Sequence, residues 1–565
     1  WKRDLYHQLA PAIKPQAIIA SNTSGLSITS LSQALPEQLR HRFCGVHFFN
    51  PPRYMHLVEL IPTADTEPAL LDDLEAFLVS QLGKGVVRAK DTPNFVGNRI
   101  GVFGILSVFA QAEKFGLPYD LVDELTGKRL GRAKSGTFRT ADVVGLDTLA
   151  HVVRTMQDQL PDDPFHAHFV VPPVVAALIE KGALGQKTGA GFYRKEGKAI
   201  LRLDPAKGEY VPADSTIDEG VAAILAERDP GKRLKALRES DHPQAQFVWA
   251  VLRDGFHYSA VHLADIADTA RQVDEAMTWG FGHAQGPFEI WQSAGWCEVA
   301  GWIAEDIKAG KALSSAPLPG WVTRGPVWDA QGVQTAEGSW NPRTQKFQPR
   351  SDLPVYRRQI AAPRLVGEPD SLNDTVVFEN EAVKCWTLPA PHPQEVLILS
   401  FKSKMHTLGP DVVSGIVRAV DLAEASFKAL VIGQLSEPFS AGADLKAMLP
   451  VFAAGGAAAV EPIEREMQDM VLRLRYAQVP VVAALAGMAL GGGCELSVHC
   501  ARRVAHFETY IGLVEAGIGL VPGAGGLTYC ARRAAELQAE GAPDAPLLVF
   551  LKKFALAVAS AQVSR

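Results

Sequence analysis

An internal repeat constrains the fold of this chain more than any other feature of its sequence. The segment VDELTGKRLGRAKSGTFRTADVVG at 122–145 is echoed by VDEAMTWGFGHAQGPFEIWQSAG at 273–295. Each copy follows a long stretch in which apolar residues recur with helical spacing, at 98–115 and 246–264. A unit that occurs twice predicts two related helical domains in the middle of the chain.

Strand-like and helix-like segments alternate ahead of the repeat. Residues 2–14 have a helical pattern, and short apolar strands are predicted at 16–20, 43–49 and 56–61. This alternation favours a parallel α/β sheet, in which ligands lie beyond the carboxyl ends of the strands. The polar residues 22–24 and 47–50 follow two of these strands, so we expect chemistry there.

A second α/β domain is predicted beyond the repeat. Residues 314–375 are rich in Pro, Gly, Ser and Thr, which predicts a linker. Strand-like runs at 395–401 and 429–433 follow it, with a helix at 410–425 between them.

Composition excludes several classes of protein. The 565 residues predict several domains, and the net charge of −6 provides no basic surface for nucleic acid. Six cysteines without a C-x-x-C pair indicate reduced thiols and a cytoplasmic location, and the histidines lack metal-ligand spacing, so no metal is predicted. The longest apolar run, 479–494, is too short and too rich in glycine to span a membrane. Because the chain begins at Trp1 inside a helical pattern, we expect it to be a fragment.

The strand ends near the N-terminus carry an imidazole and a carboxylate. The strings are SNTSG at 21–25, GVHFFNPP at 45–52 and HLVEL at 56–60, which contain His47 and Glu59. An imidazole takes the hydroxyl proton in an alcohol dehydrogenation, and a carboxylate orients it. Taken alone, His47 would more simply be a core histidine and Glu59 a solvated charge, but the neighbouring residues favour the catalytic interpretation.

These strings closely resemble the 3-hydroxyacyl-CoA dehydrogenase family over residues 1 to about 320. The resemblance implies that His47 is the catalytic base and that Glu59 is its partner. It further implies that Ser24 contacts both substrate and cofactor, and that Asn98, in the N-R motif, contacts the acyl carbonyl.

The same resemblance implies NAD as the cofactor. Asn50 would lie near the nicotinamide, while Lys2 and Lys187 would also serve the cofactor, as would Ser24. No G-x-G-x-x-G follows an N-terminal strand, so we do not expect this chain alone to bind NAD tightly. Asn94 stands where the family usually has glycine, and AKSGTF replaces the usual G-P-F in the first repeat. These two differences bear on the detailed geometry of the site and not on the class of enzyme.

Near the C-terminus, two glutamates accompany a glycine run. FSAGADL at 439–445 and MALGGGCEL at 488–496 contain Ala443, Gly492 and Glu495, and Glu515 follows in GLVEAGIGLVPGAGG. Two carboxylates can hold one water between them, and glycine amides opening a helix can stabilise an oxyanion. A glycine run alone would more simply indicate tight helix–sheet packing.

As a set, these motifs resemble the crotonase family, and specifically the enoyl-CoA hydratases, over residues 376–565. By that resemblance Ala443 and Gly492 supply the oxyanion amides, and Glu495 and Glu515 are the acid–base pair. The presence of both glutamates favours hydration over double-bond isomerisation. Crotonases continue into further C-terminal helices, so we expect this domain to be incomplete.

The predicted fold is therefore α/β and multidomain. It comprises a partial Rossmann-like NAD domain (1–91), two all-helical dehydrogenase C-terminal repeats (92–205 and 206–313), the linker (314–375) and a crotonase-type ββα spiral domain without its C-terminal helices (376–565). The predicted function is hydration of trans-2-enoyl-CoA followed by NAD-dependent oxidation of the 3-hydroxyacyl-CoA, in fatty acid β-oxidation. Alternatives are a dehydrogenase with an isomerase, or a non-catalytic acyl-CoA-binding scaffold. Expected partners are acyl-CoA thioesters, with a thiolase subunit or a second copy of the chain as further candidates.

Overall fold

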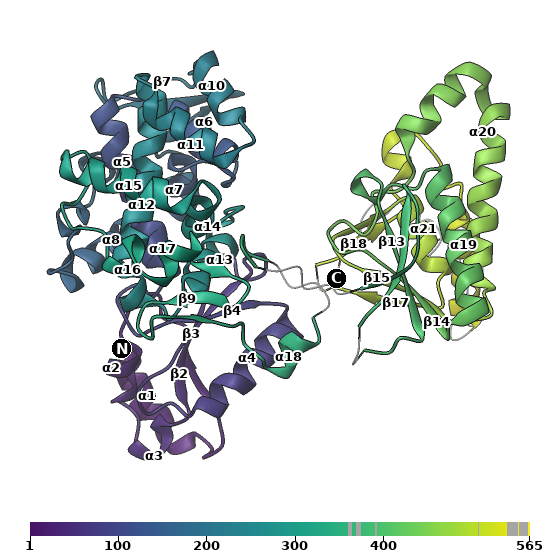
Figure 1. The fold of residues 1–565 in the computed structure, drawn as a ribbon, viewed down its shortest axis with the longest axis horizontal. Coiled ribbons are helices and arrows are strands. Elements are labelled where there is room, and N and C mark those ends of the chain that lie inside the picture. The colour runs from purple at the N-terminus through teal and green to yellow at the C-terminus, as the bar shows by residue number, and fades with distance from the viewer. Residues whose placement is uncertain are drawn as a thin grey trace. The chain divides into compact units, whose positions relative to one another are not determined.

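The computed structural model describes residues 1–359, 364–368, 374–389, 392–506 and 508–539, together with 552 and 563–564. The chain divides into two compact units, Trp1–Pro369 and Asp370–Arg565 (Figure 1). Within the described residues, no helix is long and apolar enough to cross a membrane.

Unit 1 begins with a four-stranded sheet whose order is β1 (Ile19–Ser21), β2 (Phe43–Phe48), β3 (Leu57–Ile61) and β4 (Gly85–Arg88). The surrounding helices are α1 (Lys2–Leu9), α2 (Ile28–Ser32), α3 (Glu37–Arg40) and α4 (Pro68–Leu82). The prediction of a parallel sheet is only partly correct, because β2 and β3 are antiparallel. The connection between β2 and β3 is too short for the crossover that a parallel pair requires.

The two predicted helical units are both present. Copy 1 contains α5 (Gly97–Phe115), α6 (Tyr119–Thr126), α7 (Phe138–Val144) and α8 (Leu146–Gln159). Copy 2 contains α12 (Pro243–Ile266), α13 (Ala270–Phe281), α14 (Pro287–Ser293) and α15 (Trp296–Lys308). The central helices α5 and α12 pack against each other.

A shared aspartate explains why the repeated sequence folds the same way twice. Asp123 accepts hydrogen bonds from the backbone amides of Thr137 and Phe138 at 2.6 Å, where α7 begins. In copy 2, Asp274 accepts from the Phe288 amide at 2.8 Å, in the first turn of α14. Both aspartates therefore satisfy amides that a helix N-terminus leaves without a partner.

Further elements surround these helices. Copy 1 is not purely helical, since an antiparallel sheet of β5 (Tyr193–Glu196), β6 (Ala199–Asp204) and β7 (Glu209–Pro212) follows α9 (Pro173–Glu180). Copy 2 is preceded by α10 (Glu219–Ala226) and α11 (Pro230–Glu239).

The predicted linker is largely a folded part of unit 1. It contains α16 (Gly320–Thr323), α17 (Pro326–Ala330), β8 (Gln334–Thr335), β9 (Gly338–Asn341), β10 (Lys346–Gln348) and α18 (Pro354–Arg357). Val322, Val333 and Trp340 are buried in the core of the unit. The Tyr356 hydroxyl donates to Glu75 of α4 at 2.6 Å. Small turn-rich segments bury few side chains each, so periodicity does not reveal them.

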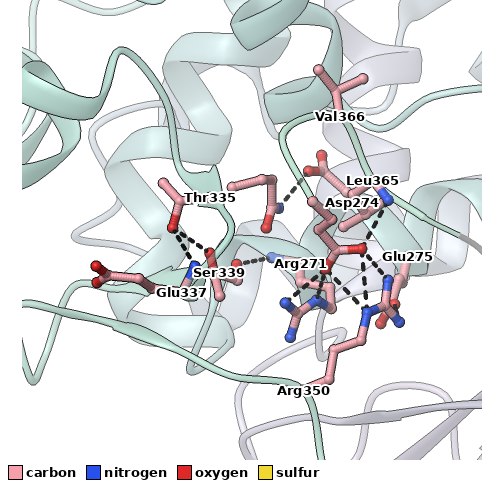
Figure 2. Close-up of polar contacts among 12 residues, drawn as sticks. Arg271, Asp274, Glu275, Thr335, Glu337, Ser339, Arg350, Leu365 and Val366 are labelled. Atoms are coloured by element: carbon pink, nitrogen blue, oxygen red, sulfur yellow. Dashed lines mark hydrogen bonds and ion pairs between the residues drawn. The ribbon is translucent and has the colours of Figure 1, made fainter. Parts of the chain in front are cut away.

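Ion pairs also join the predicted linker to copy 2 (Figure 2). Glu368 pairs with Arg271 at 2.8 Å and with Arg350 at 2.6 Å, and Arg350 reaches Glu275 at 3.4 Å. Arg271 and Glu275 belong to α13, so ion pairs join the segment after the repeat to the repeat, and both side chains of the Arg271–Glu368 pair are largely buried.

Unit 2 is built on a six-stranded sheet. Its order is β11 (Thr375–Glu379), β12 (Val383–Thr387), β13 (Val396–Phe401), β14 (Ala429–Gly433), β15 (Val481–Leu485) and β17 (Arg502–Ala505). The first three strands are antiparallel and the remainder parallel. A second sheet contains β16 (Met488–Leu490), β18 (Tyr510–Gly512) and β19 (Val563–Ser564). The helices are α19 (Pro410–Ser426), α20 (Leu445–Arg475), α21 (Gly492–His499) and α22 (Gly526–Ala539).

Candidate active sites

In unit 1 the antiparallel strands β2 and β3 place His47 directly opposite Glu59. The imidazole Nδ1 lies 2.7 Å from Glu59 Oε2, and both side chains are almost completely buried, with exposed fractions of 3 % and 0 %. A carboxylate can only accept, so Nδ1 is the donor and Nε2 is left with a lone pair. This pair has the arrangement of a general base with its orienting carboxylate.

The other oxygen of Glu59 is held by backbone. Oε1 accepts hydrogen bonds from the amides of Val96 and Gly97, at 3.0 and 2.8 Å, where α5 begins. Sequence motifs did not indicate these donors, because backbone groups leave no residue-type signature. Glu59 therefore joins the strand that carries it both to His47 and to the first helix of copy 1.

The polar turn after β1 lies at the same sheet edge as the end of β2, as predicted from the parallel pairing of these strands. The Phe48 amide donates to Asn22 Oδ1 at 3.1 Å, which fixes the turn that carries Ser24. Ser24 and Asn50 are both exposed at this edge. Lys2 is half-buried, and its Nζ donates to Ser21 Oγ at 3.4 Å. Burial lowers the pKa of Lys2.

Asn98 lies in the first turn of α5, next to a buried anchor. The neighbouring Arg99 donates to Asp163 Oδ2 at 2.7 Å and to the Tyr258 hydroxyl at 2.5 Å. These contacts tie the start of α5 to α12 of copy 2, which fixes the position of Asn98. Asn98 itself is only partly buried.

Lys187 is placed differently from the other predicted cofactor residues. Its ammonium makes a bidentate ion pair with Asp147 of α8, at 2.6 and 2.7 Å, and both side chains are exposed. Among the described residues, no hydrogen bond or ion pair joins Lys187 to Lys2, Ser24 or Asn50. Within the described residues, Lys187 thus makes no direct polar contact with the other predicted cofactor residues.

In unit 2 the predicted oxyanion amides lie close together. Ala443 N is 3.5 Å from the position that a Cβ on Gly492 would take, and Gly492 is the first residue of α21. Within the described part of the chain, neither amide has a hydrogen-bond acceptor. Gly491 has a φ of +51°, which glycine adopts without strain, and this opens the helix with free amides. The pair can stabilise negative charge on a carbonyl oxygen.

The two predicted glutamates flank the start of α21. Glu495 is buried, and its Oε1 accepts from the Gly526 amide at 2.8 Å. Glu515 Oε1 lies 3.1 Å from the position of a Cβ on Gly491, and its buried Oε2 has no hydrogen-bond partner within the described residues. Burial, together with the charge of Glu515, raises the pKa of Glu495 to about 7, although the Gly526 amide opposes this. Burial also raises the pKa of Glu515.

A third carboxylate, Glu464 of α20, was not predicted from the sequence. Its carboxylate lies against Gly523, in the loop before α22. Its charge contributes to raising the pKa of both Glu495 and Glu515, and burial raises its own pKa. The sequence offers no signal for it, because Glu464 lies far from Glu495 and Glu515 in the chain and belongs to none of the motifs.

The two units thus define a class of protein. A dehydrogenase-type base and carboxylate lie on the two central strands of an α/β sheet joined to two helical repeats. A crotonase-type domain with paired carboxylates follows on the same chain.

Comparisons with known proteins agree with this class. The family described as "3-hydroxyacyl-CoA dehydrogenase, NAD binding domain" matches residues 1–92, and its C-terminal domain family matches residues 95–195. The family "Enoyl-CoA hydratase/isomerase" matches residues 394–543.

Two relatives align with nearly the whole chain. A "Probable 3-hydroxyacyl-CoA dehydrogenase" of Bacillus subtilis is 36 % identical over 91 % of this chain and 63 % of its own length. A "Putative fatty acid oxidation complex trifunctional enzyme" of Rickettsia felis is 31 % identical over 93 % of this chain and 67 % of its own. The crystal structure of 3-hydroxybutyryl-CoA dehydrogenase from Escherichia coli K12 aligns with 55 % of this chain and 75 % of its own, at 21 % identity and a TM-score of 0.42.

The chain belongs to the family of fatty acid oxidation enzymes that join 3-hydroxyacyl-CoA dehydrogenase domains to an enoyl-CoA hydratase/isomerase domain. It spans about two thirds of the length of these curated relatives.

Proposed function

We propose that this protein carries out two consecutive steps of fatty acid β-oxidation. Water is added across the C2=C3 bond of a trans-2-enoyl-CoA, and the resulting (S)-3-hydroxyacyl-CoA is oxidised to the 3-ketoacyl-CoA with NAD as oxidant. The observation that carries the proposal is the presence of two different acid–base pairs on one chain, His47–Glu59 and Glu495–Glu515.

In the hydratase site, the two glutamates would work on one water. One carboxylate takes a proton from the water as its oxygen attacks C3, and the other, protonated, delivers a proton to C2. The buried Glu495 and the half-buried Glu515 favour sharing one proton, which agrees with the raised pKa of both. The negative charge that develops on the thioester oxygen is met by the amides of Ala443 and Gly492.

In the dehydrogenase site, His47 Nε2 would accept the proton of the 3-hydroxyl group. Glu59 holds the Nδ1–H tautomer and offsets the positive charge of the imidazolium. Asn98 would hold the acyl carbonyl, and Ser24 would contact the substrate.

NAD, when bound, supplies the acceptor for the hydride that leaves C3. The exposed edge with Ser24 and Asn50 suits the nicotinamide end, and the half-buried ammonium of Lys2 adjoins it through Ser21. Residues 1–92 contain no G-x-G-x-x-G turn, so they supply this part of a dinucleotide site and not the pyrophosphate cradle. A cofactor role for Lys187 rests on the resemblance alone, since its ammonium pairs with Asp147.

The test gives the full-length protein a trans-2-enoyl-CoA and NAD. Loss of the conjugated thioester absorbance and appearance of NADH are followed together, in the unchanged protein and in Glu495→Gln and His47→Gln. We expect Glu495→Gln to abolish the first signal from enoyl-CoA yet oxidise supplied 3-hydroxyacyl-CoA, and His47→Gln to do the reverse. Loss of both activities in either single variant, with the fold intact, would contradict two independent sites. Movement of a cis-3 double bond without hydration would identify an isomerase, and CoA-ester binding without turnover a scaffold.

Acyl-CoA thioesters are the proposed ligands, and a thiolase subunit or a second copy of the chain is a candidate partner. The name "fatty acid oxidation complex", given to the Rickettsia relative, supports the thiolase subunit as a partner. A cytoplasmic location is proposed because all six cysteines are free thiols.

A further inference from the structure

Two adjacent residues just before α5 have left-handed backbone. Asn94 has a φ of +63° and Phe95 a φ of +52°, and each side chain is 1 % exposed. Residues other than glycine disfavour the left-handed region of backbone conformation. Asparagine disfavours it least, and a bulky residue such as phenylalanine disfavours it strongly. Backbone strain of this kind persists only where the surrounding structure enforces it, and it gathers at functional sites.

The left-handed pair turns the chain so that two successive amides face one point. The Val96 and Gly97 amides, which follow it directly, both donate to Glu59 Oε1, at 3.0 and 2.8 Å. Concave arrangements of successive amides of this kind bind anions. With Oε2 occupied by His47 at 2.7 Å, both oxygens of Glu59 are fixed.

The pair also touches the imidazole itself. The Phe95 ring centroid lies 5.5 Å from that of His47, and Phe49 lies 4.7 Å from it. His47 is therefore confined by two aromatic rings, one of which belongs to the strained turn. Both members of the dyad are in contact with the same four-residue segment, 94–97.

The carboxamide of Asn94 does not explain why asparagine stands there. Its Nδ2 is buried without an acceptor among the described residues, and its Oδ1 lies 3.0 Å from the position of a Cβ on Gly25. The side chain fills space beside the turn of Ser24 without a hydrogen bond. What the position requires is the backbone conformation.

We propose that the left-handed pair Asn94–Phe95 is the positioning element of the His47–Glu59 dyad, and that residue 94 acts through its backbone by aiming the Val96 and Gly97 amides at Glu59. The inference rests on the proposed dehydrogenase function for its catalytic meaning. Residue 94 touches neither reacting atom, so it is a positioning residue.

The experiment reads the dyad directly, without substrate or NAD. The Nδ1 proton of His47 is observed by NMR in protein labelled with ¹⁵N-histidine, and His47→Gln identifies the signal. Asn94→Ala makes the left-handed conformation costly with the smallest side chain, whereas Asn94→Gly restores it without the carboxamide. Gln331→Ala is the matched control, because Gln331 has a φ of +55° in a turn after α17.

We expect Asn94→Ala to move the Nδ1 proton signal upfield and to speed its exchange with solvent, as the hydrogen bond to Glu59 loosens. Asn94→Gly should keep the signal of the unchanged protein. Gln331→Ala should lower stability as Asn94→Ala does and leave the signal unmoved. An unmoved signal in Asn94→Ala overturns the proposal, and so does an equal change in Asn94→Gly, which would assign the effect to the carboxamide.

A second measurement does not depend on variants at position 94. Amide hydrogen exchange at Val96 and Gly97 is compared between the unchanged protein and Glu59→Ala. Protection that disappears in Glu59→Ala supports the proposal, and equal exchange in both proteins overturns it. Because neither measurement uses turnover, a protein that shows both expected results yet forms no NADH would contradict the proposed function and leave the positioning role standing.

Discussion

The two sites use buried carboxylates in opposite ways. Glu59 has donors on every side, namely the His47 imidazole and the amides of Val96 and Gly97. Glu495 is almost equally buried but relies on backbone amides at the start of α22, with the carboxylates of Glu515 and Glu464 nearby. The same side chain thus meets only hydrogen-bond donors in unit 1, whereas in unit 2 it also lies near other acids.

The difference shows that the groups packed around a buried carboxylate decide what it can do. A carboxylate whose oxygens are both bound to donors is a fixed orienting group. A buried carboxylate that lies beside other carboxylates holds a proton near neutral pH even when a backbone amide donates to it, which suits proton transfer. Four predictions test this contrast, in order of decreasing expected effect.

The strongest test removes proton transfer in unit 2. Glu495→Gln keeps the size of the side chain but cannot exchange a proton, so we expect the hydration rate to fall by about 10³-fold. Oxidation of supplied 3-hydroxyacyl-CoA should be unchanged. Glu515→Gln should have a similar effect. Retention of most hydration activity in either variant would show that the carboxylates are not a working pair.

The corresponding change in unit 1 affects orientation. In Glu59→Gln the carboxamide oxygen can still accept from Val96 and Gly97, but its NH₂ group then faces His47 Nδ1 and disfavours the required tautomer. We expect the oxidation rate to fall by roughly 10²-fold, with hydration unaffected. Steady-state rates of both reactions provide the measurement, and the exposed Glu67→Gln is the control. Equal losses in both reactions would point to unfolding.

The helical repeats also contain buried carboxylates, and the third prediction concerns two of them on α13. Burial raises the pKa of Glu275 to about 7, despite Arg350 and Arg271, and burial and the Glu289 charge raise the pKa of Asp274. Because the folded state holds protons that the unfolded chain releases near its ordinary carboxyl pKa, stability is greatest below that value and falls as the pH rises towards 7. For Glu275 the loss is about 3 kcal/mol.

Urea unfolding of the protein at pH 5 and pH 8, followed by tryptophan fluorescence, measures this loss. Glu275→Gln should remove much of the difference between the two pH values, and the exposed Glu337→Gln should not. A pH dependence that is unchanged in Glu275→Gln would show that Arg350 and Arg271 keep Glu275 ionised.

The smallest effect concerns Glu464. Its negative charge helps to raise the pKa of Glu495, so Glu464→Gln should lower that pKa. If the protonated pair is the active form, hydration declines as the pH rises through about 7, and this decline should move to lower pH in Glu464→Gln. Glu461→Gln, one turn earlier on α20 and exposed, is the matched control. An identical pH–rate profile in the two variants would exclude Glu464 from the site.

Part of the fold and of the two sites could be predicted from the sequence, because it depends on residues that are close together in the chain. The repeat predicted the paired helices, and the strands that present His47 and Glu59 are short runs of apolar residues with clear ends. The glycine run before Glu495 predicted a helix opening with free amides, and α21 begins there. Domain order follows from the order of motifs along the chain.

Contacts between distant elements could not be predicted in this way. The opposed register of His47 and Glu59 depends on an antiparallel pairing that the alternation of strands and helices did not indicate. Glu464 reaches the site from a helix 31 residues before Glu495 in the chain, and nothing near either residue encodes their proximity. The segment that follows copy 2 was predicted as a linker because its buried residues, such as Trp340, are few and irregularly spaced.

The sequence by itself thus determined which chemical groups the chain carries and which local element holds each one. Only the tertiary structure decided how many donors each carboxylate receives, and therefore which one orients and which ones transfer protons. The physical reason is that secondary structure follows from periodicity and backbone preference over a few residues. The environment of a buried charge is instead set by backbone amides and charges that distant segments bring to it.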